Sequence, residues 1–151
     1  MIGLISDTHG LMRPEALAAL QGVDLIVHAG DIGKPEVLVA LKRIAPVAAI
    51  RGNNDIGHWA AKIPDHRTIN VGAVKLYVIH DLKELDFALV ERGFHAVISG
   101  HSHKPSISER DAVIMVNPGS AGPRRFKLPI AVARLRIRGV QLTPEIVELK
   151  I

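Results

Sequence analysis

Short apolar runs in this chain end repeatedly at polar side chains that are able to bind a metal ion. The first run, residues 2–5, stops at Ser6-Asp7-Thr8-His9. Side chains alternate along an extended chain, so Asp7 and His9 project to the same side while Thr8 points away. Asp-x-His also occurs in ordinary strand-to-loop turns. The repetition of the arrangement favours a metal site over such a turn.

Four later apolar runs end in the same manner. The groups that follow them are Gly30-Asp31 after residues 24–29, Gly52-Asn53 after 47–50, His80 after 74–79, and Gly100-His101-Ser102-His103 after 96–98. The His-x-His pair is the strongest of these signals, because two histidines at this spacing form a natural chelating pair. In open α/β sheets, ligands gather beyond the carboxyl ends of the strands. We therefore expect all five groups to meet at one edge.

Length and composition limit the class of protein. With 151 residues, 48% of them hydrophobic, the chain is long enough for one core, and we expect a single soluble domain over residues 1–151. Cysteine is absent and histidine occurs eight times, so any metal must be held by oxygen and imidazole. The sequence shows neither a basic leader nor a long apolar segment. We therefore expect no membrane insertion and a cytoplasmic location.

The net charge of +4 is concentrated near the carboxyl terminus. Residues 121–151 contain seven Lys or Arg against two Glu. This asymmetry suits an anionic partner. Aromatic residues are only 3% of the chain, so few side chains are available to stack on bases, and we expect no stable complex with nucleic acid.

Helix signals lie between the apolar runs. Pro14 opens a helix that stops at Gly22, and Pro35 opens a second helix. A third helix is predicted over residues 82–92. Asp81 and Glu84 have the spacing of a capping box at its start, which favours a capping role for Asp81 over a ligand role.

Further strands are predicted from alternation and turn residues. Residues 67–71 and 74–79 form a hairpin around Gly72-Ala73, residues 113–116 form a short strand, and residues 130–138 form an exposed antiparallel strand followed by a last strand over 140–149. The arginines of the 130–138 run share one face, which we interpret as solvated. His28 lies inside a strand, and we interpret it as a hydrogen-bonded core residue, not a ligand.

Taken together, the strand-end groups resemble the calcineurin-like metallophosphoesterases, in particular their small bacterial and archaeal phosphodiesterase branch. The segment Asn117-Pro118-Gly119-Ser120 followed by Pro123-Arg124 is also similar to that branch, although turn chemistry alone explains its first four residues. The resemblance implies an α/β fold, a four-layer α-β-β-α sandwich of two mixed sheets. It also implies a dinuclear metal site at the carboxyl ends of the strands.

The resemblance also implies a ligand set. One ion would be held by Asp7, His9 and His103, the other by Asn53, His80 and His101, with Asp31 bridging both. Such donors suit divalent ions; we expect manganese, with iron, cobalt, nickel and zinc as alternatives. Two ions about 3.5 to 4 Å apart can share a hydroxide that attacks phosphorus.

The implied function is a metal-dependent phosphodiesterase that acts on a small phosphodiester. Asp31, Asn54 and His101 are its catalytic candidates, and Asn54, Arg124 and Arg125 its substrate-binding candidates. Two positions depart from the family pattern. Asn54 stands where many members have a histidine that resembles a general acid, and His80-Asp81-Leu82 stands where the branch often has His-Gly-His. Release of a poor leaving group is therefore in doubt.

Three other functions remain open. A subunit of the retromer complex resembles this fold with an incomplete metal site, so a non-catalytic scaffold is one alternative. All seven ligand positions are filled here, which favours an enzyme. A nuclease or phosphomonoesterase of the same superfamily is the other alternative, and a homo-oligomer is compatible with each.

Overall fold

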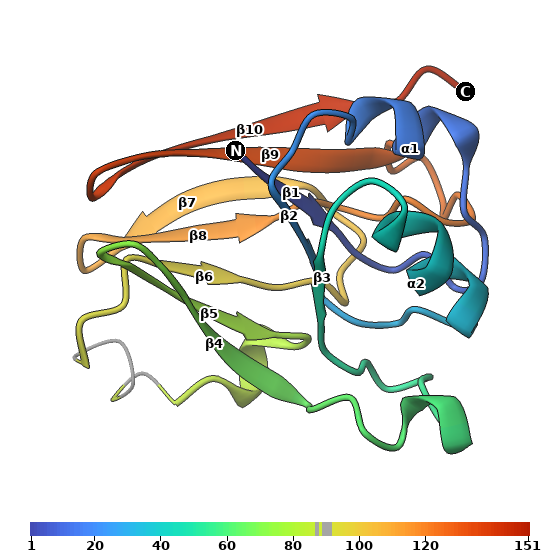
Figure 1. The fold of residues 1–151 in the computed structure, drawn as a ribbon, viewed down its shortest axis with the longest axis horizontal. Coiled ribbons are helices and arrows are strands. Elements are labelled where there is room, and N and C mark those ends of the chain that lie inside the picture. Colours follow the sequence, from blue (N-terminus) through green and yellow to red (C-terminus); the bar gives the residue numbers. More distant parts are fainter. Residues whose placement is uncertain (87, 89–91) are drawn as a thin grey trace.

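Two mixed five-stranded sheets form the centre of the fold (Figure 1). The computed structural model describes residues 1–86, 88 and 92–151. The first sheet contains β1 (Ile2–Ile5), β2 (Leu25–His28), β3 (Val47–Ala49), β9 (Ala131–Arg138) and β10 (Gln141–Glu148). The second contains β4 (His66–Val71), β5 (Val74–Ile79), β6 (Ala96–Ile98), β7 (Ser106–Arg110) and β8 (Val113–Asn117).

Each sheet contains three parallel strands. The first sheet has the order β10-β9-β1-β2-β3, in which β1, β2 and β3 are parallel. The second has the order β4-β5-β6-β8-β7, in which β5, β6 and β8 are parallel. Antiparallel strands complete each sheet. Because the parallel strands of a sheet end at the same edge, the loops that follow them lie together.

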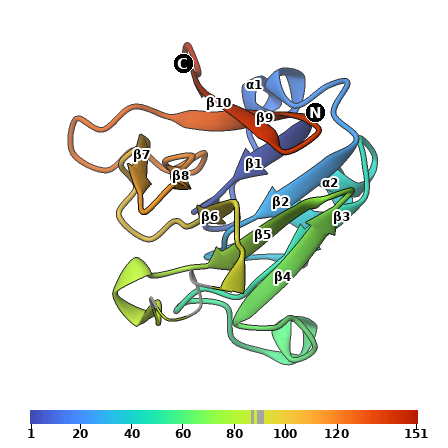
Figure 2. The same ribbon diagram turned by 90° about the vertical axis from the view of Figure 1, so that its left-hand side faces the viewer.

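The main core lies between the sheets, which appear as two layers in Figure 2. Leu4 and Val27 of the first sheet belong to the same buried cluster as Leu76 and Ile98 of the second. Burying one such side chain stabilises the fold by roughly 1.5 to 3 kcal/mol relative to leaving it exposed. This core fixes the edge at which the strand-end groups gather.

Helices α1 (Pro14–Ala19) and α2 (Pro35–Lys42) pack on the other face of the first sheet. Each begins with proline and carries a glutamate in its first turn, as the sequence predicts. Leu20 and Leu41 are fully buried against Ile5 and Ile26 of the sheet. The glycine at position 3 permits this approach, because a Cβ there would lie 2.7 Å from Cδ2 of Leu20.

The predicted helix over residues 82–92 is wrong at its start. Leu82–Glu84 form one 3-10 turn, η2, and Leu85 then adopts an extended conformation. The carboxylate of Asp81 accepts a hydrogen bond from the amide of Lys83. Asp81 therefore has the predicted capping role, but at a 3-10 turn and not at an α-helix. Leu85 leaves the helical path to pack on the outer face of the second sheet. Residues 87 and 89–91 of this prediction lie outside the described residues.

Strand β9 also differs from its prediction. It lies between β10 and β1, and its first half is buried, so it is not an exposed strand. Arg134 donates from Nη1 to the carbonyl oxygens of Ala19 and Gln21 at 2.7 and 3.3 Å. It thereby provides hydrogen-bond donors to backbone carbonyl groups at the carboxyl end of α1. The arginine face is therefore only partly solvated. Over the described part of the chain, no helix is both long and apolar enough to cross a membrane.

Candidate metal centre

Five strand-end side chains that are far apart in the sequence meet at one edge of the sheets. Asp7, His9 and His103 offer ligand atoms that lie within 4.8 Å of one another, and Asp7, Asp31 and His80 form a second such group. Asp7 follows β1, Asp31 follows β2, His80 follows β5 and His103 lies in the loop after β6. The expected meeting of the groups is therefore found for these five residues.

Three imidazoles point at a single oxygen of Asp7. The Nε2 atoms of His103, His9 and His80 lie 3.4, 3.9 and 3.9 Å from Oδ1 of Asp7. Oδ1 of Asp7 and Nε2 of His80 are buried and make no hydrogen bond. Buried polar atoms are normally paired, and an unpaired one costs about 1 to 3 kcal/mol. A cation between these atoms would satisfy them, so the donor set fits a metal ion.

The other oxygen of Asp7 is already used by the protein. Oδ2 accepts hydrogen bonds from Oγ of Ser6 at 2.8 Å and from the backbone amide of His101 at 3.1 Å. Burial nevertheless raises the pKa of Asp7, although the charge of His80 opposes it. A bound cation would stabilise the ionised form. The two hydrogen bonds hold the carboxylate so that Oδ1 faces the histidines.

Asp31 and His80 form a charged pair at the centre of the second group. Nε2 of His80 lies 3.3 Å from Oδ2 of Asp31, and Nε2 of His9 lies 3.8 Å from the same oxygen. Burial raises the pKa of Asp31, but the contact with His80 and the amide of Asn54 outweigh it and lower the pKa to about 2. Oδ2 of Asp31 thus lies between the Nε2 atoms of His9 and His80.

The backbone at this edge is strained. Among the described residues, eight other than glycine have a positive φ, and five of them are Asp7, His9, Asp31, His101 and His103, at 47° to 72°. Such conformations cost about 1 to 3 kcal/mol each and cluster at functional sites. Nearby glycines leave room for this geometry. A Cβ at Gly30 would lie 2.7 Å from Nδ1 of His80.

His28 is a core residue, as predicted, and it connects two of the loops. Its Nδ1 accepts a hydrogen bond from the amide of Gly30 at 3.1 Å, so its Nε2 carries the proton and donates to Oγ1 of Thr8 at 3.0 Å. Thr8 in turn donates to the carbonyl of Ile32 at 2.8 Å. Burial lowers the pKa of His28 to about 3, so the ring is neutral. Both nitrogens are occupied and neither is available to a metal.

Asp55 is a supporting residue that the sequence analysis did not identify. Its carboxylate is buried and accepts hydrogen bonds from the backbone amides of Ile32, Gly33 and Gly52 at 2.8 to 3.0 Å. It therefore joins the loop after β2 to the loop after β3 and is unavailable as a ligand. In the sequence, Asp55 follows Gly52 by three residues, which is typical of a turn. This local pattern does not indicate the hydrogen bonds from the amides of Ile32 and Gly33.

The loop after β8 supports the other side of the site. Oγ of Ser120 donates to the carbonyl of Asp7 at 3.0 Å, and Nδ2 of Asn117 donates to the carbonyl of Gly100 at 3.0 Å. Asn117 also accepts from the amide of Gly119 at 2.9 Å. The Asn117–Ser120 segment is thus more than a turn, because it holds the backbone of both the first and the fifth ligand groups.

Two of the seven expected ligands, His101 and Asn53, are exposed. The side chain of His101 is 44% exposed, and its Nε2 lies 3.8 Å from Oδ2 of Asp81. Its ring is edge-on to His80, with centroids 5.2 Å apart. Asn53 is exposed on the loop after β3. Asn54, next to it, donates its backbone amide to Oδ1 of Asp31 at 3.0 Å and its side-chain amide to Oδ2 at 3.4 Å.

The two arginines expected to bind substrate differ in their contacts. Nη1 of Arg124 donates to the carbonyl of Leu128 at 3.2 Å and so braces its own loop. The charge of Arg125 acts on His103: burial, followed by this charge, lowers the pKa of His103 to about 4. Of these two arginines, Arg125 is therefore the one whose charge affects a candidate ligand.

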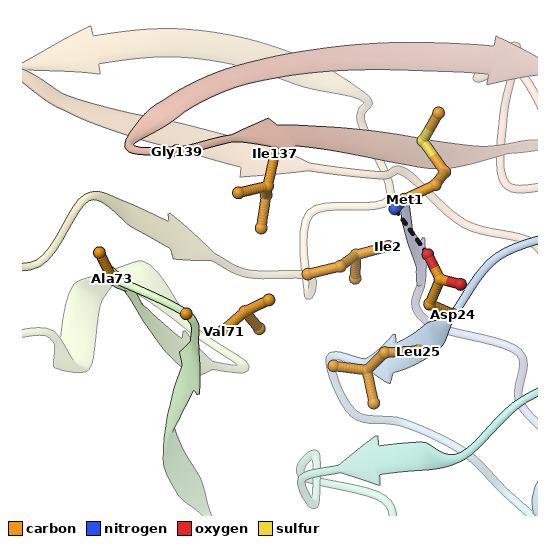
Figure 3. A pocket seen from close by; sticks show the side chains of 9 residues that line it. Met1, Ile2, Asp24, Leu25, Val71, Ala73, Ile137 and Gly139 are labelled. Atoms are coloured by element: carbon orange, nitrogen blue, oxygen red, sulfur yellow. Dashed lines mark hydrogen bonds and ion pairs between the residues drawn. The ribbon is translucent and has the colours of Figure 1, made fainter.

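A large hollow lies at the opposite end of the sheets. It has a volume of about 510 Å³ and lies where β1 begins, between the turn that joins β4 to β5 and the turn that joins β9 to β10. Figure 3 shows Ile2, Leu25, Val71 and Ile137 around it, with the amino group of Met1 paired to Asp24 at its rim. Its walls are mainly apolar and carry none of the candidate ligands. This hollow is therefore separate from the candidate metal centre.

Comparison with known proteins identifies the family. The model of the calcineurin-like phosphoesterase superfamily domain matches residues 1–139. The chain belongs to this superfamily. A probable metallophosphoesterase from Methanothermobacter thermautotrophicus is 37% identical, over 97% of this chain and 91% of the relative. A phosphodiesterase from Methanocaldococcus jannaschii is 27% identical, over 78% of this chain and 82% of the relative.

A solved structure shows the same fold. The crystal structure of Chaetomium thermophilum Vps29 superposes with a TM-score of 0.85 at 20% identity, covering 99% of this chain and 88% of that one. The expected α/β fold with two mixed sheets is confirmed. At this level of identity the likeness concerns the fold alone.

Proposed function

We propose that this phosphoesterase is a phosphodiesterase that uses two divalent cations, and that its substrate is a small phosphodiester. The observation that carries the proposal is the convergence of three imidazole Nε2 atoms on the unpartnered Oδ1 of Asp7. Family membership and the phosphodiesterase among the relatives support it. We further propose that the whole chain acts as one domain in the cytoplasm.

In this proposal the ligands are those implied by the sequence. Asp7, His9 and His103 would hold one ion, Asn53, His80 and His101 would hold the other, and Asp31 would contribute to both. When bound, the ions would polarise the phosphoryl oxygens and activate water for attack on phosphorus. Manganese is our first expectation, and iron, cobalt, nickel and zinc share the same ligand preferences. Asn53 and His101 are the two members of this ligand set whose side chains are exposed.

The protein's own groups would position the substrate and the protons. The amide hydrogens of Asn54 face the Asp31 carboxylate and would orient that carboxylate or a phosphoryl oxygen. Asn54 cannot donate a proton to a leaving oxygen, because an amide does not ionise at neutral pH. Arg125, whose charge reaches His103, would attract the anionic substrate. These roles favour diesters with leaving groups that need no proton.

The main alternative is a scaffold without catalysis, which the Vps29 fold brings into consideration. The experiment that separates the two measures bound metal and hydrolysis of bis(4-nitrophenyl) phosphate by the full chain. We expect about two ions per chain, loss of activity with a chelator, recovery with Mn²⁺ and slower hydrolysis of 4-nitrophenyl phosphate. Bound metal with no hydrolysis of either ester would favour the scaffold, and absence of bound metal would overturn both the site and the reaction.

A further inference from the structure

Large apolar side chains are exposed on the loops that carry the candidate ligands. Among the described residues, eight large hydrophobic side chains are exposed. Four of them follow a site residue within two positions: Leu11 after His9, Ile56 after Asn54, Leu82 after His80 and Phe126 after Arg125. We call these four residues the apolar rim. Single exposed apolar residues are ordinary, but a group around one site marks a binding surface.

Phe126 is the most exposed of the four and has an unfavourable backbone. Its side chain is 88% exposed and its φ is 54°. A positive φ is sterically unfavourable for a bulky residue. The amide of Leu128 donates to the carbonyl of Arg125 at 3.1 Å, so Phe126 lies inside a closed turn. Neither packing nor backbone preference accounts for phenylalanine here, which favours a role in binding.

The loop of Phe126 is attached to the metal site. Arg13 donates from Nε and Nη2 to the carbonyl of Gly122 at 3.3 and 3.2 Å. The amide of Ala121 donates to the carbonyl of Ser6 at 3.1 Å, one residue before Asp7. These bonds fix the base of the loop beside the first ligand group. The loop that carries Phe126 therefore begins beside the site, and the charge of Arg125, the residue before Phe126, acts on His103.

Ile56 is presented rigidly on a second side. It is 79% exposed and directly follows Asp55, whose carboxylate is fixed by three backbone amides. The same loop carries Asn54, which contacts Asp31. A phosphate that reaches Asp31 would therefore lie beside the loop that carries Ile56.

We propose that the apolar rim binds the apolar ester group of the substrate, so that the enzyme selects phosphodiesters of aryl or long-chain alkyl alcohols over those of small polar alcohols. The inference rests on the proposed function and specifies its substrate class. Charge supports it, because Arg124, Arg125 and Lys127 flank Phe126 and match a phosphate that carries an apolar group. The ring of Phe126 and the guanidinium group of Arg125 together would contact both parts of such a diester.

The test varies the retained ester group while the leaving group stays constant. The substrates are the methyl, hexyl and phenyl esters of 4-nitrophenyl phosphate, assayed with the full chain loaded with Mn²⁺. We expect the wild-type protein to prefer phenyl over methyl by about tenfold in kcat/KM, the lower end of what apolar contacts give in closed pockets. Phe126→Gly and Ile56→Ser should each reduce this ratio about threefold, mainly through KM.

Two controls separate recognition from folding. Val140→Ser removes another exposed apolar side chain, 57% exposed, at the far end of β9, and should keep the wild-type ratio. Phe126→Gly should not lower the midpoint of thermal unfolding, because glycine accepts a positive φ without strain. A lower midpoint with an unchanged ratio would show a structural role and overturn the inference.

The remaining outcomes are also decisive. Unchanged ratios in Phe126→Gly and Ile56→Ser would overturn the inference while leaving the proposed reaction intact. A dimer that Phe126→Gly dissociates, again with unchanged ratios, would show that the rim is a contact between copies. If the wild-type protein hydrolyses no diester, the proposed function fails. The inference is then judged by binding: equal affinity of the Mn²⁺-loaded chain for diphenyl and dimethyl phosphate would overturn it.

Discussion

His80 is held between a backbone carbonyl and a carboxylate. Its Nδ1 donates to the carbonyl of Ala29 at 2.7 Å, and its Nε2 lies 3.3 Å from Oδ2 of Asp31. Burial lowers the pKa of His80, but these two contacts outweigh burial and raise it to about 9. In the metal-free protein at neutral pH, His80 is therefore protonated and Asp31 ionised. A metal ion can bind Nε2 only after that proton leaves.

The first prediction follows for metal binding. At pH 7, binding of Mn²⁺ to the metal-free protein should release about one proton, and affinity should rise with pH up to about 9, where His80 is already neutral. Titration calorimetry in PIPES and in MOPS, whose heats of ionisation differ, measures the release. His80→Gln should abolish most of it. Identical heats in both buffers would contradict the assignment of the proton.

The second prediction concerns Asp31. Asp31→Ala should remove activity and weaken binding of both ions, because the carboxylate lies between His9 and His80. The fold should persist, since the core between the sheets is untouched. Metal analysis and circular dichroism measure the two effects. Asp24→Ala is the matched control, because Asp24 is exposed at the other end of β2. Two tightly bound ions and normal turnover in Asp31→Ala would refute the bridge.

The strand ends could be predicted because they depend on local pattern. An apolar run followed by a polar ligand type indicates where a parallel strand stops, and Asp7, Asp31 and His80 were located in this way. The pattern did not predict β7, because all five of its residues are exposed and it pairs with β8 through backbone hydrogen bonds. An edge strand of this kind shows no apolar alternation.

The supporting contacts could not be predicted, because they join distant positions. His9 and His103 are 94 residues apart, and only the fold places their Nε2 atoms 3.3 Å apart. The carboxylate of Asp55 is satisfied by amides from two loops, and neither loop reveals this in its sequence. The same holds for Leu85, which leaves the predicted helix because the second sheet offers it a buried position.

The third prediction separates the two arginines. Arg125→Ala should raise KM for an anionic diester and reduce its dependence on salt, because an exposed charge is screened over about 10 Å at 0.1 M. Arg124→Ala should have the smaller effect, since Arg124 is bonded to Leu128 within its own loop. Steady-state kinetics at 20 and 300 mM NaCl test the difference. Equal salt dependence in the wild-type protein and Arg125→Ala would assign Arg125 to the solvated surface.

The fourth prediction concerns stability and pH. His28 has a pKa of about 3 in the folded protein, whereas the ordinary pKa of histidine is 6.5. Below pH 6.5 the unfolded chain therefore binds a proton at this residue that the folded chain does not bind. Its contribution is complete above pH 6.5 and declines as the pH falls toward 3, by about 1.4 kcal/mol per pH unit. Urea unfolding of the metal-free protein at pH 6.5 and 4.5 measures the slope. His28→Gln should be less stable at pH 6.5 but flatter between the two values, and parallel slopes would contradict this cause.

The last prediction concerns Asn54, whose amide faces Asp31 and cannot protonate a departing oxygen. The acidity of the leaving group should then control the rate: aryl diesters should react well, alkyl diesters slowly, and monoesters poorly unless another group supplies the proton. Asn54→His should reverse part of this, with a gain of about a hundredfold on poor leaving groups and little on nitrophenyl esters, because general acid catalysis contributes about 10²–10⁴-fold. Metal content must be equal in both proteins. The slope of log kcat/KM against leaving-group pKa decides the matter, since a steep slope in the wild-type protein that becomes shallow in Asn54→His identifies the missing acid, whereas identical slopes show that the proton comes from another group.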